Sequence, residues 1–115
     1  MIGKVGLSVP PGNVVGLRLT ASVATRRIQT LASQSGSIVL GDAARRQMVA
    51  IGFTHPQLAA FLTSAKVTGA PDKLDQTPDA WRCRVEGNVR SAGRGAGVTV
   101  VLGIGRIYVE GVEWV

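Results

Sequence analysis

The chain has 115 residues, a length that fits one domain with a single core. Hydrophobic residues make up 45 % of it, which is ordinary for a globular protein and excludes a disordered chain. Thirteen Lys and Arg against seven Asp and Glu give a formal net charge of +6, which favours an anionic partner, nucleic acid above all. The alternative is that the charge serves solubility alone.

The sequence also argues against several other classes of protein. No apolar run approaches the length of a membrane span, and the N-terminus lacks the ordered segments of a signal peptide, so a cytoplasmic protein is predicted. Cys83 is the single cysteine and His55 the single histidine, so neither an internal disulfide nor a structural zinc site is expected. The glycines between Gly87 and Gly105 match no nucleotide-binding loop. We therefore expect no metal and no cofactor.

Residues 1–19 are predicted to form an N-terminal arm, because glycine, proline and aliphatic residues are mixed there around a turn signal at 10–13. Residues 20–115 are predicted to form a single α+β domain. Its first helix is expected to begin after Thr20, a fair N-cap, and to end in the polar segment 33–36. The apolar positions of this helix recur at helical spacing, at Ala21, Ala24, Ile28 and Leu31.

A second helix is predicted after the short apolar run at 38–40. Asp42 is expected to be its N-cap, and Gly52 is a stop signal. The core-facing stripe of this helix comprises Ala44, Met48 and Ile51. This stripe leaves Arg45 and Arg46 on the open flank.

A third helix is predicted to follow directly. Thr54 is expected to cap it, and Pro56 suits its first turn because proline lacks the N–H that a first turn leaves unpaired. Leu58, Phe61 and Leu62 are then expected to face inward. His55 falls in the first turn, which argues against a role as general base.

The C-terminal part is predicted to be a sheet. After a polar surface loop over 68–79, residues 81–86 alternate, with Trp81, Cys83 and Val85 on the core face. Residues 87–97 are rich in glycine and are predicted to be a long hairpin connection. Residues 98–102 form an apolar strand, a turn follows at 103–105, and residues 106–110 alternate again before 112–115. The expected class is therefore α+β, with N-terminal helices followed by an antiparallel sheet of three to four strands.

The polar face of this sheet is the strongest candidate site. It collects Arg82, Arg84, Arg106 and Tyr108, together with Glu86 and Glu110. Arginines neutralise phosphate and stabilise charge in a phosphoryl transition state, and a tyrosine can stack on a splayed base or donate a proton. The alternative is a solvated face with cross-strand Arg–Glu pairs.

We therefore assign candidate roles on this basis. Arg82, Arg84 and Tyr108 are the candidate catalytic residues. The candidate RNA-binding residues are Arg45, Arg46, Arg106 and Trp81. Cys83 is interpreted as a small core residue.

A family resemblance rests on residues 38–48, 52–54 and 81–87. They read Ile-Val-Leu-Gly-Asp-Ala-Ala-Arg-Arg-Gln-Met, Gly-Phe-Thr and Trp-Arg-Cys-Arg-Val-Glu-Gly. They resemble the small bacterial domains of unknown function marked by the motif His-Ala-x-x-Arg-Met. That group is similar to the BrnT and RelE-type ribonuclease toxins of toxin–antitoxin pairs. The resemblance covers about residues 20–115 and implies a barnase-like α+β fold and an RNA target.

The chain departs from that family at three positions. The family's motif His aligns with Ala43, its motif Arg with Gln47, and the Arg of the following turn with Ile51. If the His takes part in proton transfer, its loss removes a contribution of about 100-fold or more. RelE-like enzymes, however, act largely through arginines and a tyrosine. Here that role would fall to Arg45, Arg46, Arg82, Arg84 and Tyr108.

Three functional hypotheses remain from the sequence. The first is an RNA-directed toxin-like domain, which if active is a metal-independent endoribonuclease with a cognate antitoxin. The second is a catalytically degenerate module that binds or inhibits another protein, as a phage or mobile-element product. The third is a structural subunit of an oligomer, in which residues 1–19 and 112–115 add strands to another chain. No membrane partner is expected.

Overall fold

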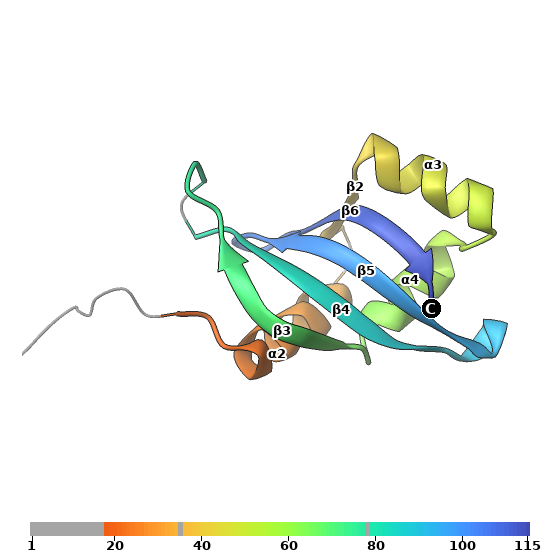
Figure 1. Ribbon diagram of the computed structural model, residues 1–115, viewed down its shortest axis with the longest axis horizontal. Helices are drawn as coiled ribbons and strands as arrows, with labels where there is room; N and C mark the ends of the chain where they lie inside the picture. Colours follow the sequence, from red (N-terminus) through yellow and green to blue (C-terminus); the bar gives the residue numbers. More distant parts are fainter. Residues whose placement is uncertain (1–17, 35, 78) are drawn as a thin grey trace, which may run out of the picture.

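The computed structural model describes residues 18–34, 36–77 and 79–115. Its helices are α2 (Ala21–Ala32), α3 (Asp42–Ile51) and α4 (His55–Leu62). Its strands are β2 (Ile38–Leu40), β3 (Lys66–Lys73), β4 (Trp81–Val89), β5 (Arg94–Leu102) and β6 (Ile107–Trp114). They form one sheet in the order β2-β6-β5-β4-β3, shown in Figure 1. The predicted α+β class, with helices ahead of the sheet, is confirmed. Residues 1–17 of the predicted arm lie outside the described residues.

The prediction of an antiparallel sheet of three to four strands is wrong in two respects, because within the described residues the sheet has five strands and is mixed. β2 runs parallel to β6, with Ile38 opposite Ile107 and Leu40 opposite Val109. A parallel pair needs a long crossover, and here the whole chain from α3 to β5 lies between the two strands. Sequence patterns do not report such a distant partner.

The predicted surface loop at 68–79 is also corrected, because β3 runs from Lys66 to Lys73 and pairs antiparallel with β4. The register shifts between Thr68 and Asp72, and Gly69 has a φ of +73°. Such an irregularity breaks the alternation of inward and outward side chains by which a strand is recognised. β3 was therefore not visible as a periodic segment.

The predicted long glycine-rich connection is in fact mostly strand. β4 extends to Val89 and β5 begins at Arg94, with only a short 3₁₀ helix, η1 (Arg90–Ala92), and Gly93 between them. Gly87 is needed inside β4, since a Cβ there would lie 3.1 Å from the Cβ of Ala65. Close packing, and not turn formation, explains this glycine.

The helix ends follow local side-chain chemistry. The Thr20 hydroxyl accepts from the Val23 N–H, and Thr54 forms a reciprocal capping box with Gln57. Asp42 was predicted to be an N-cap, but Gly41 occupies that position and makes no side-chain capping bond. Asp42 is the first helical residue instead, where its negative charge suits the positive end of the helix dipole.

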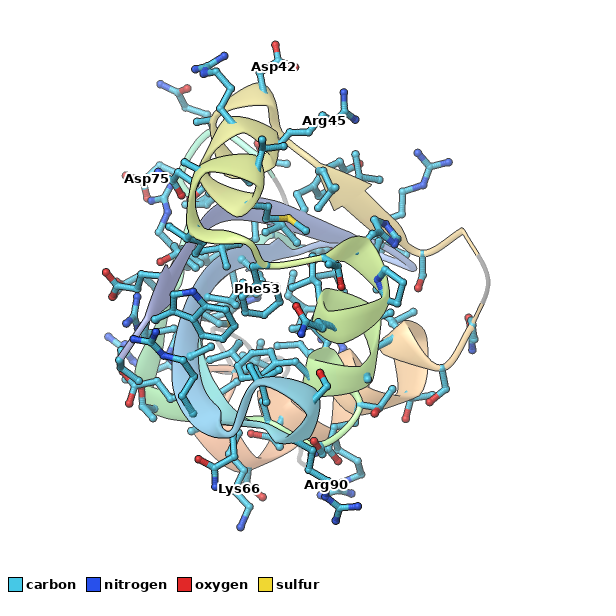
Figure 2. The ribbon with its side chains drawn as sticks, turned by 90° about the vertical axis from the view of Figure 1, so that its right-hand side faces the viewer. Asp42, Arg45, Phe53, Lys66, Asp75 and Arg90 are labelled. Atoms are coloured by element: carbon cyan, nitrogen blue, oxygen red, sulfur yellow. The ribbon has the colours of Figure 1, made fainter. Side chains whose placement is uncertain are left out.

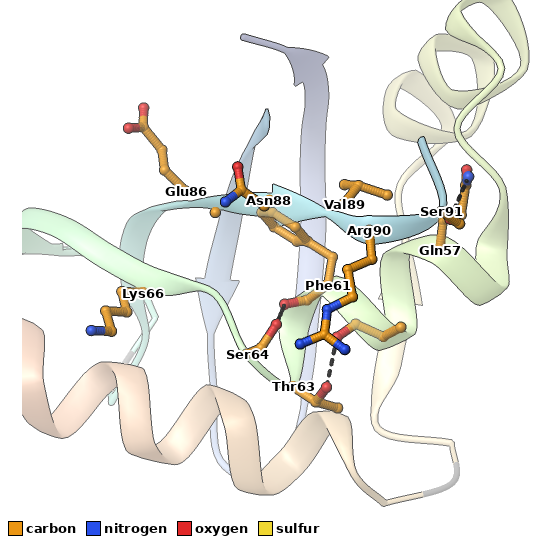
Figure 3. A pocket seen from close by; sticks show the side chains of 12 residues that line it. Gln57, Phe61, Thr63, Ser64, Lys66, Glu86, Asn88, Val89, Arg90 and Ser91 are labelled. Atoms are coloured by element: carbon orange, nitrogen blue, oxygen red, sulfur yellow. Dashed lines mark hydrogen bonds between the residues drawn. The ribbon is translucent and has the colours of Figure 1, made fainter. Parts of the chain in front are cut away.

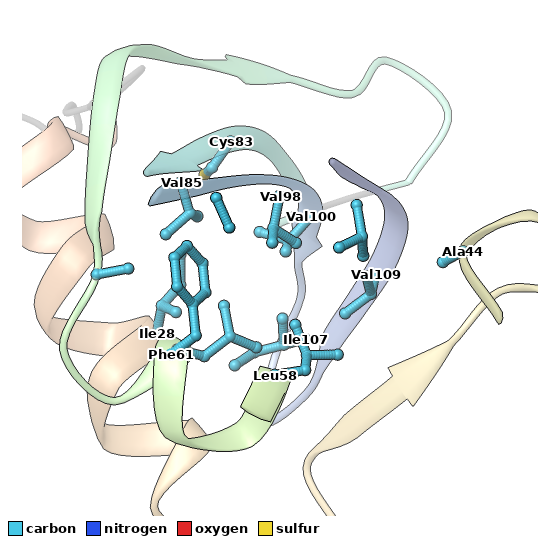
Figure 4. Close-up of a cluster of buried hydrophobic side chains, with 14 of the residues drawn as sticks. Ile28, Ala44, Leu58, Phe61, Cys83, Val85, Val98, Val100, Ile107 and Val109 are labelled. Carbon is cyan, nitrogen blue, oxygen red and sulfur yellow. The ribbon is translucent and has the colours of Figure 1, made fainter. Parts of the chain in front are cut away.

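One face of the sheet meets the helices and forms the core. Phe61, Leu58 and Ile28 from the helices pack with Val85 and Val98 from the strands, as Figure 4 shows. α2 packs beside β3 and α3 beside β6. No helix in the described part of the chain is long and apolar enough to cross a membrane. The other face of the sheet, called the outer face below, carries the alternating polar residues.

Side chains of α2 and α3 form hydrogen bonds with backbone groups at β3 and β6. The Thr25 Oγ1 accepts from the Val67 N–H of β3 at 2.9 Å, and the Gln29 Nε2 donates at 3.1 Å to the carbonyl of Ala65, just before β3. On β6, the Gln47 Oε1 accepts from the Val112 N–H at 2.9 Å. These contacts satisfy outward-facing backbone groups that would otherwise be left unpaired.

Thr25→Val is expected to destabilise the fold by about 1–3 kcal/mol, because it leaves the N–H of the buried Val67 without its acceptor. The measurement is urea unfolding followed by tryptophan fluorescence. Thr30→Val on the exposed side of the same helix is the matched control, with an expected change within about 0.5 kcal/mol. Equal effects of the two variants would contradict this account of the β3 edge.

Candidate functional site

The outer face brings together the three residues predicted to be catalytic. Arg82 and Arg84 project from β4, and Tyr108 projects from β6. Arg82 lies opposite Val101 of β5, which in turn lies opposite Tyr108. Two strand spacings therefore separate the backbones of Arg82 and Tyr108, or about 10 Å. A single nucleotide unit can contact both side chains.

Arg82 is held by a carboxylate from β6. Its Nε lies 2.8 Å from Glu110 Oε1, and its Nη2 lies 3.2 Å from Glu110 Oε2, which makes a bidentate pair. The hydrogen bond from Arg82 lowers the pKa of Glu110, and the same bond raises the pKa of Arg82. Glu110 is therefore an ionised acceptor at neutral pH.

Arg84 is also paired, in this case with two carboxylates. Its Nε lies 3.2 Å from Glu86 Oε2, and its Nη2 bonds to Glu113. Its guanidinium lies across Gly97 of β5, where a Cβ would overlap it. The outer face thus contains the cross-strand Arg–Glu pairs that the sequence suggested as an alternative. Arg84 is consequently the less accessible of the two cations, with 32 % of its side chain exposed against 46 % for Arg82.

A hollow of about 470 Å³ lies beside Tyr108 on this face. Its lining includes Thr77, Val101, Ile104, Tyr108 and Glu110. The Tyr108 residue is 42 % exposed and Ile104 is 77 % exposed, although both are large and partly or wholly apolar. An exposed ring and aliphatic side chains beside an ionised carboxylate can hold a flat, partly polar group such as a nucleobase.

The predicted RNA-binding residues do not form one cluster. Arg106 is exposed in the turn before β6, next to Tyr108 in the chain. Arg45 and Arg46 are exposed on α3 at the β6 edge, away from the outer face, and Arg45 is labelled in Figure 2. Trp81 is half-buried and packs against the core, so only part of its ring is open to a ligand.

The remaining titratable candidates take structural positions. Cys83 is buried on the core face of β4, as predicted, and burial raises the pKa of its thiol to about 11. A thiol with this pKa is almost wholly protonated at neutral pH and is a poor nucleophile. His55 is the first residue of α4, also as predicted.

Two of the three positions that the resemblance aligns with motif residues, Gln47 and Ile51, form hydrogen bonds with β6, whereas Ala43 is exposed. Ala43, Gln47 and Ile51 are spaced at four-residue intervals along α3, so they share one side of the helix. Gln47 accepts from the Val112 N–H, and the Ile51 carbonyl accepts from the Trp114 Nε1 at 2.9 Å. An arginine has no acceptor atom and could not replace Gln47 in this contact.

Sequence reasoning missed the part played by Glu113. Simple alternation along β6 places Glu113 on the core side, opposite to Glu110 in orientation. A register shift between Thr99 and Val100, opposite Glu110 and Gly111, reverses the alternation and puts Glu113 on the outer face. Gly111 was the one local signal of this irregularity, since glycine inside a strand often marks a bulge.

Comparisons with protein-family profiles, curated proteins and solved structures return no match for this chain.

Proposed function

We propose that this chain is an RNA-directed, toxin-like domain that holds an unpaired base in the hollow beside Tyr108 and cleaves the neighbouring phosphodiester. The observation that carries the proposal is this hollow, which has an exposed aromatic ring in its lining and the carboxylate of the Arg82–Glu110 pair at its side. Arg106 extends the same row of side chains and is suited to a flanking phosphate. A cytoplasmic location and a cognate antitoxin belong to the same proposal.

The proposed cleavage is a transesterification within the RNA strand. The 2′-hydroxyl gives its proton to Glu110, and its oxygen bonds to the adjacent phosphorus. The bond from phosphorus to the 5′-oxygen breaks, and that oxygen takes a proton from the Tyr108 hydroxyl. The products are a 2′,3′-cyclic phosphate and a 5′-hydroxyl end. Arg82 stabilises the negative charge that develops on the phosphoryl oxygens.

The Arg82–Glu110 ion pair sets how strong a base Glu110 is in this mechanism. In the free protein, the hydrogen bond from Arg82 lowers the pKa of Glu110 and makes the carboxylate a weak base. When a phosphate binds Arg82, the guanidinium divides its hydrogen bonds between phosphate and carboxylate. Glu110 then becomes a stronger proton acceptor at the moment when substrate is in place.

A second function, binding without chemistry, is favoured by a different observation. Arg84 is already paired with Glu86 and Glu113, and Gln47, at a position that the resemblance gives to a motif arginine, bonds to β6. On this view the domain grips RNA, an antitoxin or another protein through the same face and cleaves nothing.

Tyrosine variants separate the two functions. With single-stranded RNA, Tyr108→Phe is expected to keep binding and to lose cleavage by about 100-fold, because it keeps the ring but not the proton. Tyr108→Ala is expected to weaken binding as well, by about 1–3 kcal/mol for one lost stacking contact. Binding is measured by fluorescence anisotropy and cleavage by gel, with the cyclic phosphate end identified by mass spectrometry.

Thr68→Ala, on the outer face but outside the hollow, is the control and should change neither quantity. RNA binding without cleavage by the unmodified chain would reject the enzyme and leave the binding module. Failure to bind RNA at low salt would reject the RNA-directed function as a whole.

A further inference from the structure

A second surface of the molecule has a different character, and it lies at the edge of β4. β3 begins at Lys66, opposite Glu86, but β4 continues for three more residues to Val89. Gly87 still packs against Ala65, but over Asn88 and Val89 the side of β4 that faces away from β5 has no strand beside it. The pairing of β3 with β4 thus ends at Lys66 and Glu86, while β4 continues to Val89.

The register decides which backbone groups point into this gap. In an antiparallel pair, successive residues direct their N–H and C=O alternately to one neighbour and to the other. The Val115 N–H donates to the Gly95 carbonyl at 3.0 Å, so the backbone N–H and C=O of Gly95 point toward β6. The backbone N–H and C=O of its β4 partner, Asn88, therefore point away from β5. The Val67 N–H, which donates to Thr25, gives the same alternation from the β3 side. Asn88 thus offers a donor and an acceptor as the next rung after the pair of Lys66 and Glu86.

This open rung contrasts with other edges of the sheet. The Val67 N–H of β3 is taken up by Thr25, Pro71 has no N–H to offer, and the Val112 N–H of β6 is bonded to Gln47. No hydrogen bond within the described residues involves the backbone of Asn88 on its open side. An unpaired, exposed rung is a site where an extended chain can add to a sheet.

A hollow of about 690 Å³ accompanies the open rung and is shown in Figure 3. It lies between the C-terminal part of α4 and β4, with Phe61 and Gly87 among its lining residues and the hydroxyls of Thr63 and Ser64 at one side. Lys66 and Arg90 contribute the cations of the lining, and neither forms an ion pair with a described residue. Glu86, the carboxylate of the lining, is already paired with Arg84. The charge left free in the hollow is therefore positive.

We infer that this edge is a docking site for an extended acidic peptide segment, which adds to β4 as a short strand. Its backbone pairs with the N–H and C=O of Asn88, and its carboxylate side chains meet Lys66 and Arg90. The hydroxyls of Thr63 and Ser64 already donate to the carbonyls of Ala60 and Phe61, so the two cations are the groups that meet the carboxylates. This site lies at a different edge from the hollow beside Tyr108 and does not depend on RNA.

The test uses a defined peptide, acetyl-Thr-Val-Glu-Val-Glu-Val-Thr-amide, and amide hydrogen exchange followed by NMR. In the free protein the Asn88 amide should exchange fast, while the amides of Gly87 and Val89, which face β5, should be protected. Addition of the peptide should slow exchange at Asn88 at least tenfold. The glutamine version of the peptide should bind more weakly, with little dependence on salt.

Two variants locate the contact. Asn88→Pro removes the N–H that the peptide needs and should abolish binding, whereas Asn88→Ala keeps the N–H and should retain it. If Asn88→Pro does not fold, the double variant Lys66→Ala/Arg90→Ala decides, since it should weaken the acidic peptide about tenfold or more without touching the backbone. Protection of the Asn88 amide in the free protein would overturn the inference. So would an oligouridylate that binds through Lys66 and Arg90 when the peptide does not.

Discussion

Phe61→Ala is expected to destabilise the domain by about 3–5 kcal/mol, the range for truncating a buried aromatic residue. Phe61 is 2 % exposed, and its ring meets Phe53 edge-on with centroids 6.2 Å apart. It also stands 3.5 Å from the place where a Cβ of Gly87 would lie, so it supports β4 as well as α4. Such a loss is a large fraction of the free energy of unfolding of a domain, which is about 5–15 kcal/mol.

Urea unfolding followed by tryptophan fluorescence measures this loss. Trp114 is a suitable reporter, because it stacks on Phe53 with centroids 4.8 Å apart. Val49→Ala is the matched control: Val49 is 82 % exposed on α3, and the change should stay within about 0.5 kcal/mol. A loss below about 1 kcal/mol for Phe61→Ala would mean that the site collapses without a cavity, and would contradict the packing described above.

Glu110→Gln is expected to lower the rate of RNA cleavage about 100-fold or more, because it removes the proposed proton acceptor. The fold should survive, since an exposed ion pair such as Arg82–Glu110 contributes only about 0–1 kcal/mol. RNA affinity should be kept or should rise, because Arg82 is released from its carboxylate. Glu113→Gln is the matched control, since it loses its bond to Arg84 but does not line the hollow beside Tyr108.

The pH profile gives an independent check of this role. The pKa of Glu110 lies below its ordinary value in the free protein, so the carboxylate stays ionised as the pH falls into the usual glutamate range. The kcat/KM for cleavage by the unmodified chain, which reports the groups of the free protein, should decline only below about pH 4.3, where ordinary glutamates take up protons. The stability that the Arg82 pair contributes should be lost over the same acidic range, as the pH falls through the folded-state pKa. Unchanged cleavage by Glu110→Gln at neutral pH would remove Glu110 from the mechanism.

The local features of the fold could be predicted from the sequence. The three helices appear where apolar residues recur at helical spacing and where Thr20 and Thr54 can cap them. The alternation in residues 81–86 correctly separates the core side of Cys83 and Val85 from the outer side of Arg82 and Arg84. These are short-range properties, set by the period of the backbone and by side chains a few residues apart.

The sequence by itself therefore determined the α+β class and the arginines and tyrosine that share the outer face. Only the tertiary structure decided that β2 joins β6 in parallel, that β3 is a strand, and that Glu113 reaches Arg84 across a bulge. It also decided that both Arg82 and Arg84 are paired and that Asn88 is left as an open rung. Each of these features depends on which residues, far apart in the chain, lie side by side in the fold. The alternation of apolar and polar residues within one segment does not specify which strand it pairs with or in which register.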